Sequence, residues 1–142
     1  MIRIRKYNLD EVLPFVVMGS KKEAKAAEGA EREYLGKPVK MYSLRYQLFK
    51  TKGVKCVGCG IEGVFFGLEQ HCRGPHRPHF NLYAIDDDGN EVLMTKDHII
   101  PKSKGGKDFL GNLQPMCSRC NARKGDRYHG ETSEVQKVQN PV

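Results

Sequence analysis

Side chains that can bind a metal ion or move a proton gather in the segment 95–127. A neutral imidazole has a pKa of about 6.5 and can take a proton from water near neutral pH. Mg²⁺ prefers oxygen ligands, and a carboxylate and an amide both supply them. Hydrolysis of a phosphodiester needs these elements: an activated water and neutralisation of the phosphate charge. The residues concerned are Asp97, His98, Asn112, Asn121 and Lys124.

The order of these residues predicts a role for each. His98 is the candidate general base, and Asp97 and Asn121 are the candidate ligands of one Mg²⁺ or Mn²⁺. The amide oxygen of Asn112 can accept the second imidazole N–H of His98 and fix its tautomer. Lys124 follows Asn121 by three residues, so on a helix it shares that face and is expected to reach the phosphate. Each residue alone also suits a surface or turn position, and the combination favours catalysis.

Four of the five cysteines form two Cys-x-x-Cys pairs, Cys56 with Cys59 and Cys117 with Cys120. Four thiolates are a common ligand set for structural Zn²⁺, and a gap of two residues lets both sulfurs approach one ion. A redox pair or unrelated buried thiols are the alternatives. The sequence therefore predicts one zinc that ties the segment before residue 60 to the helix after residue 116.

The chain is basic, with 24 Lys and Arg against 17 Asp and Glu and a net charge of +7. Such a balance favours a polyanionic partner, with nucleic acid ahead of an anionic membrane. No apolar run approaches the roughly 20 residues of a membrane span, and the start lacks the pattern of a signal peptide. We expect a cytoplasmic protein, in the host cytosol if a phage encodes it. Cations expected to contact DNA are Arg45, Lys50, Lys52, Lys102, Lys104, Lys107, Arg119 and Arg123.

The 142 residues suit one α+β domain with a helical N-terminal extension. Helices are expected over 20–35, where Ser20 is a candidate N-cap, and over 40–52. A short strand at 64–68 and a β-hairpin of strands 80–85 and 91–96 follow, with a loop over 101–111 and a helix from about residue 117 to Gly125. We divide the chain into a basic, mostly helical accessory region (1–54), a core (55–127) and a frayed tail (128–142).

The segment 71–79 contains three histidines, two prolines and the fifth cysteine. A further metal cluster is one interpretation, but the spacing matches no established ligand pattern. A basic surface loop with a spare thiol is the alternative that we favour. The residues are His71, Cys72, His76 and His79.

The motif DHIIPKSKGG…NLQPMCSRCNARKG, with the paired cysteines, resembles the HNH (ββα-metal, or His-Me finger) nuclease family in its H-N-N variant. The resemblance covers about residues 55–125 and departs from the eponymous pattern at Asn121, where a histidine is expected. It implies a ββα-metal core in which His98 is the general base, Asn112 orients it, and Asp97 and Asn121 hold one Mg²⁺ or Mn²⁺. The cysteines would hold a structural Zn²⁺, and the substrate would be DNA.

Three functions remain open from the sequence. The first is an HNH endonuclease that nicks or cuts DNA, alone, as a homodimer or with a targeting partner, in homing, phage replication or packaging, restriction or repair. The second is a zinc-braced nucleic-acid-binding module without catalysis. The third is a four-cysteine scaffold for protein contacts. The complete catalytic set and the surplus of positive charge favour the first.

Overall fold

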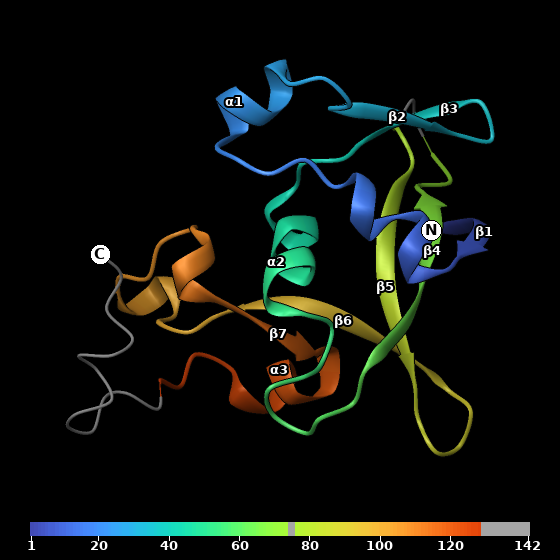
Figure 1. The fold of residues 1–142 in the computed structure, drawn as a ribbon. Helices are drawn as coiled ribbons and strands as arrows, with labels where there is room; N and C mark the ends of the chain where they lie inside the picture. Colours follow the sequence, from blue (N-terminus) through green and yellow to red (C-terminus); the bar gives the residue numbers. More distant parts are fainter. Residues whose placement is uncertain (74–75, 129–142) are drawn as a thin grey trace.

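A five-stranded antiparallel sheet forms the centre of the computed structural model, which describes residues 1–73 and 76–128 (Figure 1). The strand order is β1-β4-β5-β6-β7, and each neighbouring pair is antiparallel. The bounds are β1 Ile2–Tyr7, β4 Gly63–Gln70, β5 His79–Ile85, β6 Glu91–His98 and β7 Leu113–Cys117.

The sheet and its surroundings share one hydrophobic core that centres on Phe80 of β5. The ring of Phe80 meets those of Tyr7, Tyr34 and Phe66 edge-on, with centroids 5.7, 4.8 and 5.8 Å away. Tyr46 adds a fourth ring at 6.3 Å, and its hydroxyl accepts the backbone N–H of Phe80 at 2.7 Å. Aromatic side chains from β1, from β4 and from the segments around residues 34 and 46 therefore pack on one residue of β5.

The helix expected over 40–52 is confirmed as α2, Leu44–Lys52. Ser43 is its N-cap and accepts the backbone N–H of Tyr46, while Gly53 ends it with a φ of +92°. The segment Tyr46–Phe49 is buried, which places α2 against β6 and β7. The apolar residues of this stretch thus predicted the face of the helix that is buried.

The helix expected over 20–35 is wrong beyond its first turns. Ser20 caps α1 with a capping box, as the sequence suggests, but α1 covers only Lys21–Ala26. The chain then forms a second, two-stranded sheet of β2, Glu31–Tyr34, and β3, Lys37–Lys40. Burial of Tyr34 against the Phe80 core outweighs the helix propensity of the alanines and glutamates. Residues 1–54 are therefore mixed in structure rather than mostly helical.

The expected strands at 64–68, 80–85 and 91–96 are present, each slightly longer than the sequence indicated. Asp86 closes the hairpin between β5 and β6, where its N–H donates to the carbonyl of Asn90 at 2.9 Å. The helix after the second cysteine pair is α3, Ser118–Lys124, and Gly125 follows it as expected. The sequence missed β7, which contains Pro115 and lies at the edge of the sheet, where a missing N–H is tolerated.

In the described residues, no helix combines the length and apolar character needed to cross a membrane. The expected frayed tail lies outside the described residues except for Tyr128, which is buried. The division at residue 54 stays a prediction about function, because β1 pairs with β4 and so joins the same sheet as the core.

Candidate active site and four-cysteine centre

The candidate catalytic residues lie on one continuous unit of β6, β7 and α3. β6 ends at His98, β7 pairs with it antiparallel, and α3 follows β7 directly. Because side chains alternate along a strand, Thr95 and Asp97 share one face of β6. Both contact α3, through Asn121 and Lys124 respectively. The pairing of β6 with β7 therefore brings residues 97 and 121, far apart in sequence, to one place.

Asp97 is a buried carboxylate with two partners. Its Oδ2 accepts a hydrogen bond from Gln114 Nε2 at 2.9 Å, and the ammonium of Lys124 lies 3.0 Å from the same oxygen. Lys124 is also buried, and it donates to the backbone carbonyl of His98 at 3.0 Å. The sequence predicted that Lys124 reaches the phosphate, but the structure instead uses its ammonium to hold Asp97 and His98 together. A carboxylate can bind about four donors, so Asp97 keeps lone pairs that can meet a metal.

His98 pairs with Asp108, a residue for which the sequence predicted no role. The distance from His98 Nε2 to Asp108 Oδ1 is 2.5 Å. The hydrogen bonds from His98 and Lys102 lower the pKa of Asp108 from 3.8 to about 2, so its carboxylate is ionised at neutral pH. Asp108 is the one carboxylate in the loop 101–111. That isolation was the signal that could have identified it.

Asn112 does not orient the imidazole of His98, contrary to the expectation. Its Oδ1 accepts the N–H of Ile100 at 2.9 Å, and its Nδ2 donates to the carbonyls of Ile100 and Lys107 at 3.1 and 3.0 Å. Asn112 is fully buried and so fastens both ends of the loop that carries Asp108. The physical reason for the difference is that the loop folds back over residue 112 and occupies all its polar atoms.

The close approach of the loop to residue 100 also depends on Gly106. A Cβ on residue 106 would lie 1.6 Å from the carbonyl oxygen of Ile100, a distance that no side chain can accept. The N–H of Gly106 donates to the carbonyl of Pro101 at 2.9 Å.

Asn121 faces the candidate metal position from α3. Its Nδ2 donates to Thr95 Oγ1 at 2.9 Å, and Thr95 in turn donates to the carbonyl of Met116 at 2.6 Å. This chain fixes which end of the amide is the donor, so the Oδ1 of Asn121 remains the acceptor end. Among the described residues, no hydrogen bond to that oxygen is present.

One cavity of about 280 Å³ brings the candidate residues together. It opens at the end of β6 and is bordered by cations as well as by the candidate ligands and base. The carboxylate, imidazole and amide required by the sequence hypothesis thus face a common space. Its lining includes Lys96, Asp97, His98, Lys102, Asn121 and Lys124.

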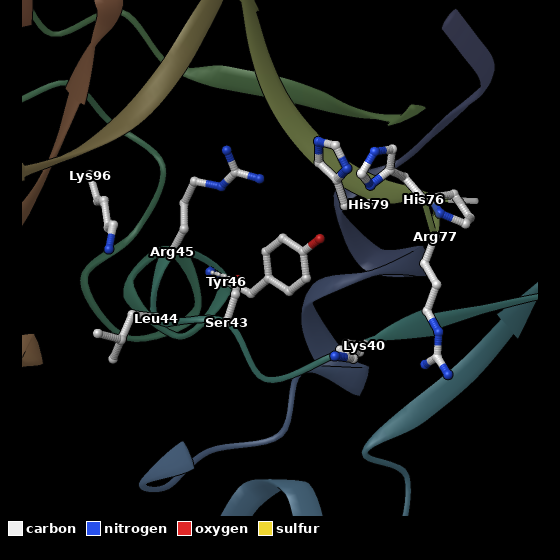
Figure 2. A pocket seen from close by; sticks show the side chains of 10 residues that line it. Lys40, Ser43, Leu44, Arg45, Tyr46, His76, Arg77, His79 and Lys96 are labelled. Atoms are coloured by element: carbon white, nitrogen blue, oxygen red, sulfur yellow. Dashed lines mark hydrogen bonds between the residues drawn. The ribbon is translucent and has the colours of Figure 1, made fainter. Parts of the chain in front are cut away.

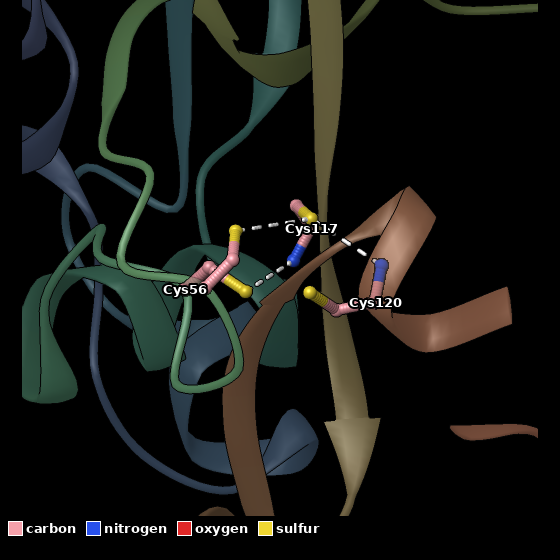
Figure 3. Close-up of side chains that lie close together, drawn as sticks. Cys56, Cys117 and Cys120 are labelled. Atoms are coloured by element: carbon pink, nitrogen blue, oxygen red, sulfur yellow. Dashed lines mark hydrogen bonds between the residues drawn. The ribbon is translucent and has the colours of Figure 1, made fainter. Parts of the chain in front are cut away.

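The four paired cysteines converge, as the sequence predicted. Their sulfurs all lie within 4.8 Å of one another, and Cys59 and Cys117 are 3.9 Å apart. Tetrahedral Zn²⁺ with bonds of about 2.3 Å requires sulfurs about 3.8 Å apart, so the cluster fits this ion. Figure 3 shows Cys56 on the loop before β4, with Cys117 and Cys120 approaching from β7 and α3.

Backbone amides surround the sulfurs of this cluster. Burial alone would raise the pKa of the Cys56 thiol, but N–H groups of Cys117, Cys59 and Gly58 outweigh it and lower the pKa to about 6. Burial raises the pKa of Cys120 to about 12. A metal ion bound by all four sulfurs would stabilise each of them as a thiolate. A Cβ at Gly58 would lie 2.9 Å from the Cys120 sulfur, so the turn between Cys56 and Cys59 requires glycine at this position.

Several cations that we expected to contact DNA already contact the chain itself. Lys52 donates to the carbonyl of Leu113 at 2.6 Å, and Lys50 to that of Val16 at 3.0 Å, so both brace α2. Three others lie on α2 and α3 and have these contacts: Arg45 with Phe80, Arg119 with Asp86, and Arg123 with Cys120. Lys102 borders the cavity and pairs with Asp108 at 3.2 Å. Lys104 and Lys107 lie on the same exposed loop.

The histidines of the segment 71–79 approach one another. The rings of His71 and His76 have centroids 5.0 Å apart, and His71 and His79 are 6.4 Å apart. Cys72 is exposed. Within the described residues, the metal-compatible grouping of histidine, cysteine and acidic side chains is the four-cysteine cluster.

Residues 86–135 match the family described as HNH endonuclease. The similarity to this family covers about a third of the chain. It contains the whole β6–β7–α3 unit and the second cysteine pair, and the match supports a nuclease that acts on nucleic acid and uses a divalent metal. Searches among curated proteins and among solved structures returned no match. The elements before residue 86 lie outside the matched segment.

Proposed function

We propose that the protein is a metal-dependent HNH endonuclease that hydrolyses DNA phosphodiester bonds, with His98 as the general base. The observation that carries this proposal is that Asp97, His98 and Asn121 line one cavity at the end of β6. β6, β7 and α3 would form the ββα-metal unit of the family. Four sulfurs would hold one structural Zn²⁺ beside it.

The contact with Asp108 assigns the proton on His98. An ionised carboxylate only accepts hydrogen bonds, so the Nε2 that lies 2.5 Å from it carries hydrogen in the neutral ring. The Nδ1 then has the free lone pair that a general base needs. Asp108 thus takes the orienting role that the sequence hypothesis gave to Asn112.

Asp97 and the Oδ1 of Asn121 would hold the catalytic Mg²⁺ or Mn²⁺. When bound, such an ion neutralises phosphate charge and stabilises the departing oxygen. Lys124 keeps the carboxylate of Asp97 in place, 3.0 Å away, and its bond to the carbonyl of His98 fixes the end of β6. Lys102, which is exposed at the rim of the cavity, can meet the phosphate.

Cleavage of supercoiled plasmid tests this function. The wild type should convert the plasmid to nicked or linear form with Mg²⁺ or Mn²⁺, and His98→Ala should lose this activity while it still binds DNA. Thr51→Ala, an exposed position on α2 away from the cavity, is the matched control and should cleave normally. Equal cleavage by the wild type and His98→Ala would remove His98 as the base.

A second function rests on a different observation. Asp97 is buried and already neutralised by Lys124, as it would be in a site that holds no catalytic ion. A zinc-braced nucleic-acid-binding module would have this property. It is favoured if the zinc-loaded wild type binds DNA tightly and yet leaves plasmid intact with every divalent metal.

A further inference from the structure

A second and larger cavity lies between the start of α2 and the segment 76–79. Its volume is about 660 Å³. Figure 2 shows Arg45 and Tyr46 in its middle, with Lys96 on one side and His76, His79 and Arg77 on the other. Lys40, Ser43, Leu44 and Pro78 complete the lining.

The lining of this cavity carries positive charge without a carboxylate. Four of its ten residues are lysine or arginine, and two are histidine. Arg77 pairs with Glu31, which lies outside the lining. A concave surface with one sign of charge concentrates the field and attracts ions of the opposite sign. The ligand chemistry that fits is therefore anionic.

Arg45 is held in position rather than free to move. Its guanidinium donates to the carbonyl of Phe80 at 2.6 Å, and this carbonyl belongs to the residue at the centre of the core. Burial, followed by the charge of Arg45, lowers the pKa of His79. The positive charge at the centre of this cavity is thus tied to the backbone of the buried Phe80.

Lys96 connects this cavity with the candidate active site. It lines both cavities, and its Nζ lies 3.9 Å from Asp108 Oδ1, the oxygen that contacts His98. A polyanion bound at His98 would pass Lys96 and continue toward Arg45. Lys40, Arg45 and Arg77 lie outside the residues that match the HNH family.

We propose that this cavity binds the sugar–phosphate backbone of the substrate strand, at phosphates other than the one that is cut. The proposal rests on the nuclease function and adds to it a second binding region supplied by the N-terminal half of the chain. The substrate is then a polynucleotide long enough to span both cavities, rather than a short diester.

The salt dependence of DNA binding tests the cavity directly, without any need for cleavage. Lys40→Gln with Arg77→Gln removes two charges from the cavity, and Lys22→Gln with Lys25→Gln removes two exposed charges from α1 outside it. Each phosphate contact adds about 0.9 to the salt slope, so a fourfold rise in salt should weaken the wild type about 12 times more than the cavity variant. The measurement is fluorescence anisotropy with duplex DNA and no Mg²⁺.

The control pair of substitutions should leave the slope of the wild type unchanged. Equal slopes for the wild type, the cavity variant and the control would overturn the proposal. So would an equal loss of slope in the cavity variant and the control, because it would show only an effect of net charge.

A small substrate separates this inference from the nuclease function. Bis(p-nitrophenyl) phosphate offers one diester and cannot extend into the second cavity. The cavity variant should hydrolyse it like the wild type but should cleave plasmid with a raised KM. Failure of the wild type to hydrolyse either substrate would refute the nuclease function alone, and the salt slopes would still decide the binding site. A cavity variant that cleaves plasmid with the KM of the wild type would contradict the proposal.

Discussion

Replacement of Asn112 distinguishes the structural role described above from the catalytic role that the sequence suggested. Asn112→Ala removes three hydrogen bonds, of 2.9, 3.1 and 3.0 Å, to the backbone of Ile100 and Lys107. At about 1 kcal/mol for each bond, the loss in the free energy of unfolding is about 3 kcal/mol. For a chain of this size this corresponds to a fall of roughly 10 °C in Tm.

The assay is urea unfolding at pH 7, with Asn90→Ala as the matched control. Asn90 is an exposed residue of the hairpin turn, so its replacement should change stability by about 0.5 kcal/mol or less. Asn112→Ala should also lose plasmid cleavage at urea concentrations well below its unfolding transition. The reason is that the loop that presents Asp108 to His98 is released before the rest of the chain unfolds. A variant that loses cleavage completely but less than about 1 kcal/mol of stability would refute this reasoning. It would return Asn112 to a direct role at the imidazole.

Three further predictions concern the metal centre, the buried ion pair and the loop carboxylate. Metal analysis should find about one Zn²⁺ per chain. Cys117→Ser should lose the ion and unfold. Cys72→Ser, which changes an exposed thiol, should keep both the ion and the fold. A folded, metal-free wild type would contradict the zinc assignment. Lys124→Ala should lower the free energy of unfolding by about 3 kcal/mol, because Asp97 keeps a buried charge without its cation. Mg²⁺ should then raise the Tm of this variant more than that of the wild type. Equal shifts in Tm would mean that the ion does not bind at Asp97. Since the pKa of Asp108 falls from 3.8 to about 2 on folding, the stability difference between the wild type and Asp108→Asn should be complete above about pH 4 and vanish near pH 2. Acid titration of unfolding measures it, and a difference that is constant from pH 2 to 5 would refute the pairing.

The sequence predicted the elements that are specified by a local pattern, such as the spacing of cysteines or of apolar residues. The spacing of the two cysteine pairs predicted that their sulfurs converge. The apolar positions of 40–52 predicted α2, and Gly125 predicted the end of α3. β7 was missed because LQPMC contains Pro115 and lacks alternation, and it is a strand only because β6 lies beside it.

The partners within the candidate site could not be predicted in the same way. Asp108 meets His98, and Asn112 meets Ile100, through the path of a loop with no periodic pattern. Gln114 meets Asp97 because the two are opposite each other in the β6–β7 register, which requires knowledge of β7. Tyr34 was assigned to a helix because its buried partners, Tyr7 and Phe80, lie at distant positions of the sequence.

The place of β1 has a consequence for how the protein can be shortened. β1 covers the outer side of β4, so a fragment that starts at Lys55 would present the unsatisfied N–H and C=O groups of β4 to solvent. Such a bare sheet margin invites pairing between molecules. The same cut would strip Phe80 of Tyr7, Tyr34 and Tyr46. A fragment obtained by deleting the first 54 residues should therefore self-associate, and the proposed activity would have to be dissected by point substitutions in the intact chain.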